Sequence, residues 1–189
     1  SKGEPVSALE DFARAYEGEL VVFDTETTGL DIGLDEVIQI AAVKLRCGEI
    51  VDRLELYLET RREIPKMLGD IPNPMLEEYE AHRAELVTPE AGFNAFLDFV
   101  GYAPVVGHNV EYDANIVNAQ YAVLKAQLRR MRASGTGRDL EVNRTELVRR
   151  FDTLKLSHAL EPAILKAAGL RKLPSHKLKD LIAVLGLEG

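Results

Sequence analysis

The chain has little cysteine and no long apolar run, and both shortages narrow the classes of protein to which it can belong. Cys47 is the only cysteine among 189 residues, which excludes an intrachain disulfide and a zinc site built from several thiolates. No window reaches the roughly 18 consecutive apolar residues of a membrane-spanning helix, and residues 1–5 lack the basic-then-apolar order of a secretory signal. We therefore expect a cytoplasmic globular protein with no membrane partner.

Positive charge is also scarce, and it is unevenly distributed. The formal net charge of −8 is unusual for a protein that binds nucleic acid, because Lys and Arg side chains neutralise the phosphates. Residues 1–100 hold 22 acidic and 9 basic side chains, whereas residues 101–189 hold 9 acidic and 14 basic ones. A surface of this kind can gather cations at one place and contact phosphate at another, although solvated charged faces give the same distribution.

The first half of the chain predicts three consecutive strands. Leu20–Phe23 is a continuous apolar run that ends in Asp24, which is typical of a central strand buried on both faces. Residues 37–45 and 50–58 predict two further strands, joined by a tight turn at Cys47-Gly48. Residues 63–80 contain three prolines, so we expect a loop with short helical pieces there instead of a regular element.

Helices dominate the remaining predictions. Residues 1–18 are predicted to form a leading helix or linker, with helical spacing from residue 7, and residues 19–189 to form the main domain. Strands that precede helices mixed with one returning strand predict a mixed sheet covered by helices. The other predicted segments are a helix at 89–100, a strand at 105–106, a helix from 113 to about 132, a polar loop at 133–146, an apolar segment at 151–156, and two or more amphipathic helices that end with 177–185.

Asp24 and Glu26 are the most informative residues of the chain. They are separated by one residue at the carboxyl end of the first predicted strand, so the pleat projects both side chains to the same face. Without a cation, repulsion and desolvation would raise the pKa of one carboxyl, so such a pair is either hydrated at an edge or holds a hard metal ion. Thr27-Thr28-Gly29 follows directly, and these small residues let the backbone approach a ligand closely.

Two segments carry a resemblance to a known family. Phe23–Leu30 (FDTETTGL) resembles the first motif of the DnaQ-like 3′–5′ exonucleases of the DEDD type, and Gly107–Asp113 (GHNVEYD) resembles the second, which follows a strand and enters a helix. The resemblance covers nearly all of residues 19–189. It implies an α/β, ribonuclease H-like fold with a mixed central sheet of about five strands flanked by helices.

The resemblance also implies a metal site. Asp24, Glu26 and Asp113 would be catalytic ligands of two Mg²⁺ or Mn²⁺ ions, which prefer carboxylate and water oxygens. Two such ions about 4 Å apart would clamp the scissile phosphate, one activating the attacking water and the other stabilising the leaving 3′ oxygen.

Three further residues would bind substrate by the same resemblance. Thr27 and Leu30 would contact the terminal nucleotide, and Asn109 would help to shape the site. For Asn109 and the neighbouring His108, local hydrogen bonds that fix the strand-to-helix turn explain the pattern at least as well.

A third motif is expected but not found. In the histidine branch of the family (DEDDh), a His followed five residues later by an Asp supplies the general base and the fourth metal ligand. The nearest candidates, His176 and Asp180, are four residues apart, in a stretch that resembles instead the helix preceding that motif. We therefore expect a domain truncated before its third motif, which would cost roughly 10² to 10⁴ in rate, unless His176 and Asp180 form the pair.

These features predict a metal-dependent 3′–5′ exonuclease that acts on single-stranded DNA ends in proofreading or repair. The alternatives are an RNA-trimming exoribonuclease of the same family and a non-catalytic docking module. Ile64–Asp70 and Lys177–Leu181 also resemble exonuclease modules fused to bacterial repair helicases, so the expected partners include a DNA polymerase, a helicase or further domains of a longer polypeptide. Basic residues that could contact phosphate, but would equally suit a solvated face, are Lys125, Arg129, Arg130, Arg132, Lys172, Lys177 and Lys179.

Overall fold

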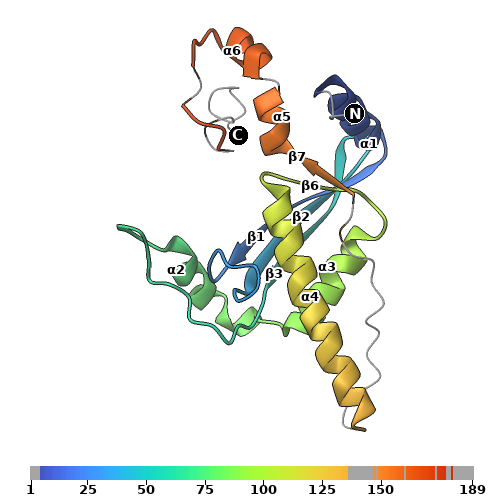
Figure 1. Cartoon of the computed structure of the whole chain (residues 1–189), viewed down its shortest axis with the longest axis vertical. Coiled ribbons are helices and arrows are strands. Elements are labelled where there is room, and N and C mark those ends of the chain that lie inside the picture. Colours follow the sequence, from blue (N-terminus) through green and yellow to red (C-terminus); the bar gives the residue numbers. More distant parts are fainter. Residues whose placement is uncertain are drawn as a thin grey trace.

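The computed structural model describes residues 5–135, 147, 149–159, 161–172, 174–177 and 180. Its centre is a mixed five-stranded sheet with the order β3-β2-β1-β6-β7 (Figure 1). β1, β2 and β3 form an antiparallel meander, β6 is parallel to β1, and β7 is parallel to β6. The predicted mixed sheet of about five strands is confirmed. The strands are β1 (Glu19–Thr27), β2 (Val37–Arg46), β3 (Glu49–Tyr57), β6 (Val105–Gly107) and β7 (Arg150–Asp152).

One face of the sheet forms the main core. Val21 and Phe23 of β1 are buried against α3 (Pro89–Val100) and α4 (Val110–Ala133), and the Phe23 and Phe96 rings lie 5.2 Å apart. On the opposite face of β1, Val22 is 38% exposed and Asp24 is exposed as well. Leu20, which shares that face, is buried with 1% of its surface exposed. Side chains alternate across a strand, so the prediction that β1 is buried on both faces holds at Leu20 and is wrong from Val22 onward.

The turn and the leading helix follow the sequence pattern. Cys47 and Gly48 both have positive φ, 51° and 77°, which is the backbone of a two-residue hairpin turn that matches the twist of β2 and β3. α1 (Pro5–Glu17) lies against the far end of the sheet, where the Phe12 ring meets the Phe151 ring edge-on at 5.5 Å. The predicted leading helix is confirmed.

The proline-containing segment is more regular than the sequence suggested. β4 (Met67–Leu68) and β5 (Ile71–Pro72) form a two-stranded hairpin, and α2 (Pro74–Ala81) follows, with the one-turn helix η1 (Arg83–Glu85) after it. The expected short helical pieces are thus confirmed. The expectation of no regular element is wrong at α2, because proline is favourable at the first position of a helix. The Asn73 side chain completes the start of α2 by accepting from the Met75 amide at 3.0 Å.

The remaining helices lie at opposite ends of the molecule. The amino-terminal part of α4 lies over the sheet and its carboxyl-terminal part points away from α5 (Thr153–Ala159) and α6 (Glu161–Ala168) (Figure 1). Within the described ranges, no helix is long and apolar enough to cross a membrane. Most of the predicted loop at 133–146 and most of the predicted helix at 177–185 lie outside the described residues.

Candidate active site

The two motifs meet at one edge of the sheet. β1 and β6 are parallel neighbours, so their carboxyl ends lie at the same edge, which is where ligands bind in open α/β sheets. β1 presents Asp24 and Glu26 on its open face, and the turn after β6 leads into α4, which carries Asp113 in its first turn. Asp113 is buried, with 5% of its surface exposed, and its carboxylate accepts a hydrogen bond from the Thr25 hydroxyl.

The three carboxyl groups share one electrostatic environment. Burial raises the pKa of Asp113 to about 7, opposed by the Thr25 hydroxyl and reinforced by the charges of Asp24 and Glu26. Burial also raises the pKa of Asp24, and burial followed by the charge of Asp24 raises that of Glu26. Asp24 and Glu26 still reach solvent, so the burial that raises these pKa values is partial. Ionising all three together is unfavourable unless a cation compensates.

The donor set fits a hard divalent ion, although the side chains do not already enclose one. Within the described part of the chain, no group of three or more His, Cys, Asp or Glu side chains is placed to hold a metal. Oxygen-only donors suit Mg²⁺ or Mn²⁺. The Thr25 hydroxyl occupies only Oδ1 of Asp113, so the other carboxylate oxygen could serve an ion, and relief of the mutual repulsion would favour its binding.

Tyr112 fastens the loop after β1 to α4. Its hydroxyl lies 2.6 Å from the Gly29 carbonyl oxygen and 2.9 Å from the Thr27 hydroxyl, which itself lies 2.7 Å from the same carbonyl. At most one hydrogen bond can join the two hydroxyl groups at a time. At least one of the two hydroxyl oxygens therefore accepts no hydrogen bond within this group. Sequence reasoning missed Tyr112, and its only signal was its place beside Asp113. The predicted contact of Thr27 with a nucleotide stays a prediction.

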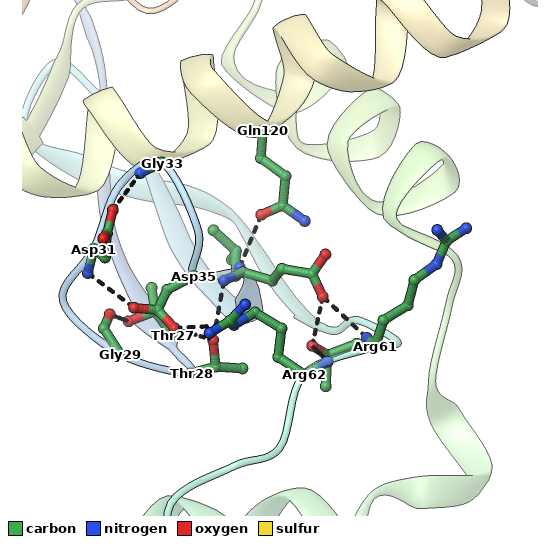
Figure 2. Close-up of polar contacts among 12 residues, drawn as sticks. Thr27, Thr28, Gly29, Asp31, Gly33, Asp35, Arg61, Arg62 and Gln120 are labelled. Carbon is green, nitrogen blue, oxygen red and sulfur yellow. Dashed lines mark hydrogen bonds and ion pairs between the residues drawn. The ribbon is translucent and has the colours of Figure 1, made fainter.

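A network around Asp35 fixes the same loop (Figure 2). The Asp35 carboxylate accepts from the Thr28 hydroxyl at 2.9 Å and the Asp31 amide at 2.8 Å, and Arg62 lies 3.3 Å from it. Burial raises the pKa of Asp35, but these hydrogen bonds and the Arg62 charge outweigh it and hold that pKa below its usual value. A Cβ at Gly29 would meet the Asp35 carboxylate at 2.5 Å, so a larger residue there would displace that carboxylate from its hydrogen bonds.

The fastened loop presents apolar side chains beside the carboxylates. Leu30 is 87% exposed and Leu34 is 61% exposed. Exposing these side chains has an unfavourable free energy, and a rigid loop that holds them out suits contact with a flat apolar ligand such as a base. The predicted role of Leu30 at the terminal nucleotide stays a prediction, now with a defined position.

Asn109 makes the sharp entry into α4. It adopts the left-handed conformation (φ 64°, ψ 47°), which Asn tolerates better than most residues. The backbone N–H of Asn109 donates to the buried Asp152 carboxylate at 3.0 Å, and the backbone N–H of Leu154 donates to the same oxygen at 2.9 Å. Sequence reasoning missed Asp152, although an acidic residue at the end of a short apolar strand was a signal. The turn explains Asn109, and its contact with substrate stays a prediction.

The histidines connect the last described segment to this edge. His108 lies with Nδ1 3.0 Å from the Thr153 hydroxyl and Nε2 2.5 Å from the His176 carbonyl oxygen. The His176 ring lies against Ser157, 2.8 Å from its hydroxyl, and stacks on His158. The Asp180 carboxylate accepts from the Ser175 hydroxyl at 2.5 Å. The backbone of His176 thus contacts His108 at the start of the second motif. The catalytic roles of His176 and Asp180 stay a prediction.

Comparisons with known proteins identify the family of the chain. A family model described as RNase_T, exonuclease, matches residues 21–189. A PolC-type DNA polymerase III from Thermotoga maritima is 32% identical over 186 residues, covering 97% of this chain and 11% of that protein. A Thermotoga petrophila relative of the same name is 38% identical over 112 residues, 58% of this chain and 8% of the relative. The chain thus spans about a tenth of the length of these relatives.

Solved structures share the fold. A product-bound exonuclease I superposes with a TM-score of 0.56 at 19% identity, covering 91% of this chain and 39% of that one. E. coli exonuclease I in complex with a dT13 oligonucleotide has the same TM-score and identity, over 90% of this chain and 36% of the other. These likenesses show the ribonuclease H-like exonuclease fold predicted from the sequence.

Proposed function

The chain belongs to the exonuclease family, and on that premise we propose that it removes nucleotides one at a time from the 3′ end of single-stranded DNA. The proposal rests on the convergence of Asp24, Glu26 and Asp113, whose pKa values are all raised by burial. The charge of Asp24 also raises the pKa of Glu26, and the charges of both raise that of Asp113. Mutual repulsion of this kind is unfavourable for folding, and it is explained by a role in holding cations.

Each proposed role follows from position. Asp24, Glu26 and Asp113 would hold two Mg²⁺ or Mn²⁺ ions, which when bound would activate water and stabilise the leaving oxygen. Leu30, on its fastened loop, would contact the terminal nucleotide. One hydroxyl oxygen of the Thr27 and Tyr112 pair stays free to accept a hydrogen bond, which the 3′ hydroxyl of a terminal deoxyribose could donate.

The substrate and the wider role are part of the same proposal. DNA is favoured over RNA because relatives are named as DNA polymerases and a neighbour of like fold binds a dT13 oligonucleotide. Proofreading or repair, within a longer polypeptide or beside a polymerase or helicase, would follow from that substrate.

The test uses the 189-residue chain with 5′-labelled single-stranded DNA and RNA of equal sequence. We expect stepwise shortening of the DNA with Mg²⁺ or Mn²⁺, none with EDTA, and loss of at least about 100-fold in rate for Asp24→Asn. Asp11→Asn, the same change on exposed α1, is the matched control and should keep the wild-type rate.

Other outcomes identify the alternatives. Faster shortening of RNA would favour the exoribonuclease. No shortening of either polymer by this chain or by a version extended at its carboxyl end to include a third motif, together with metal-independent binding of DNA, would favour the docking module and overturn the enzymatic proposal.

A further inference from the structure

The carboxyl-terminal part of α4 extends past the sheet that its amino-terminal part covers (Figure 1). The last fully buried side chain of α4 is Tyr121, and every side chain from Arg129 to Ala133 is exposed. Residues 129–133 make up more than one helical turn and gain little burial, so the packing of the core does not explain this part of the helix.

This extension is strongly basic in an acidic protein. No acidic residue lies between Asp113 and Asp139, although the chain carries a net charge of −8. Lys125, Arg129 and Arg132 follow one another at helical spacings of four and three, so their side chains emerge on one side of α4. Arg130 adds a fourth cation, and we call residues 125–132 the basic extension.

The helix dipole explains only part of this charge. Cations are favourable in the last turn of a helix, and that effect accounts for Arg130 and Arg132. It falls off within one turn, so it does not explain Lys125, whose Nζ lies 4.9 Å from the centre of the Tyr121 ring. Nor does it explain the lack of acidic side chains between Asp113 and Asp139.

We propose that the basic extension binds the phosphate backbone of the substrate strand, upstream of the 3′ end held at the carboxylates. The inference rests on the proposed function and extends it to the way the strand is held. α4 begins at the site with Tyr112 and Asp113, and Arg129 lies 16 residues further along the same rigid helix, about 24 Å at 1.5 Å per residue.

That separation sets the length of strand required. At about 3.4 Å per nucleotide for a stacked strand, 24 Å corresponds to roughly seven nucleotides, and an extended strand needs fewer. An oligonucleotide of four nucleotides whose 3′ end lies at the carboxylates therefore falls short of Arg129 when stacked. One of 16 nucleotides is long enough to reach it whether stacked or extended.

The experiment compares these two lengths. In Arg129→Gln/Arg130→Gln the charges are lost, while glutamine keeps nearly the same helix propensity. The control Arg14→Gln/Lys155→Gln removes two exposed charges from α1 and α5, so the net charge changes equally. We expect the α4 variant to lose about tenfold in kcat/KM on the 16-mer and nothing on the 4-mer, and the control to change neither.

Salt dependence gives a second reading. Losing two phosphate contacts should reduce the slope of log binding constant against log salt by about 1.4 for the 16-mer, since each contact to a single strand contributes roughly 0.7. An unchanged slope with unchanged kcat/KM on both lengths would overturn the proposal and leave the basic extension to another class of partner. Equal losses on both lengths would also overturn it.

The result is separable from the proposed function. If neither this chain nor the extended version cuts either oligonucleotide, the enzymatic proposal fails, and anisotropy of a labelled 16-mer in EDTA decides this inference alone. Weaker binding by the α4 variant than by the control supports the basic extension as a strand-binding surface. Equal binding by the two variants rejects it.

Discussion

The Tyr112 hydroxyl lies 2.6 Å from the Gly29 carbonyl oxygen and so joins the first turn of α4 to the loop that follows Asp24 and Glu26. The two residues are more than 80 positions apart in the chain. The first turn of α4 carries Asp113, and the loop directly follows the strand that carries Asp24 and Glu26. The contact therefore sets the distance between the loop after β1 and Asp113, which follows Tyr112 in the chain.

Tyr112→Phe should loosen the loop without touching the carboxylates. A hydrogen bond of this kind contributes about 1 kcal/mol, so we expect KM for single-stranded DNA to rise roughly three- to tenfold while kcat stays within about twofold. Tyr102→Phe, the same change at a residue that is 93% exposed, is the control. A fall in kcat at unchanged KM would contradict this role.

Gly29→Ala should disrupt the same loop by crowding. The new Cβ would meet Asp35 Oδ2 at 2.5 Å, and that carboxylate is held in place by Thr28, Asp31 and Arg62. We expect a loss of about 1 to 3 kcal/mol in the free energy of unfolding and at least about tenfold in kcat/KM. In Gly33→Ala the nearest atom is 3.4 Å away, so urea unfolding and rate should both stay near wild type. Similar losses in the two variants would argue against the crowding.

Asp113→Asn should stabilise the metal-free protein at alkaline pH. The folded pKa of Asp113, about 7, lies above its ordinary 3.8, so the folded state binds the proton more tightly. Its contribution to stability is full below about pH 3.8 and is lost as pH rises through 7. Near pH 8 in EDTA, the variant should be more stable than wild type by on the order of 2 kcal/mol.

Metal should raise the stability of the wild-type protein relative to Asp113→Asn. Mg²⁺ relieves the repulsion among the carboxylates, so it should raise the melting temperature of the wild-type protein at pH 8 and have little effect on Asp113→Asn. Thermal unfolding at pH 5 and pH 8, with Mg²⁺ or EDTA, measures both effects. A variant less stable than wild type in EDTA at pH 8 would show that Asp113 is not held against its charge.

Asp152→Ala should weaken the turn into α4. The carboxylate accepts from the amides of Asn109 and Leu154, and its removal leaves two donors without that acceptor. We expect a loss of about 2 kcal/mol in the free energy of unfolding, against almost none for Asp11→Ala on exposed α1. An unchanged midpoint in urea would mean that water replaces the carboxylate.

Local patterns predicted the elements well where one physical rule dominated. Gly48 beside Cys47 predicted the hairpin, because few residues adopt positive φ. The same reasoning failed at Pro74, where proline begins a helix instead of preventing one, and at Val22, where an apolar side chain did not indicate burial. Both errors arose because the effect of the residue depends on its position in the element or on what packs over it.

The sequence by itself determined the family, the mixed sheet and the three acidic side chains, because short-range spacing fixes which residues share a strand face or a helix turn. Only the tertiary structure decided that Asp113 is buried against Thr25, that Tyr112 holds Gly29, that Asp152 supports Asn109, and that the basic end of α4 extends past the sheet. Each of these pairs side chains or surfaces that are distant in the chain. Their meeting depends on how strands and helices pack, which no local pattern contains.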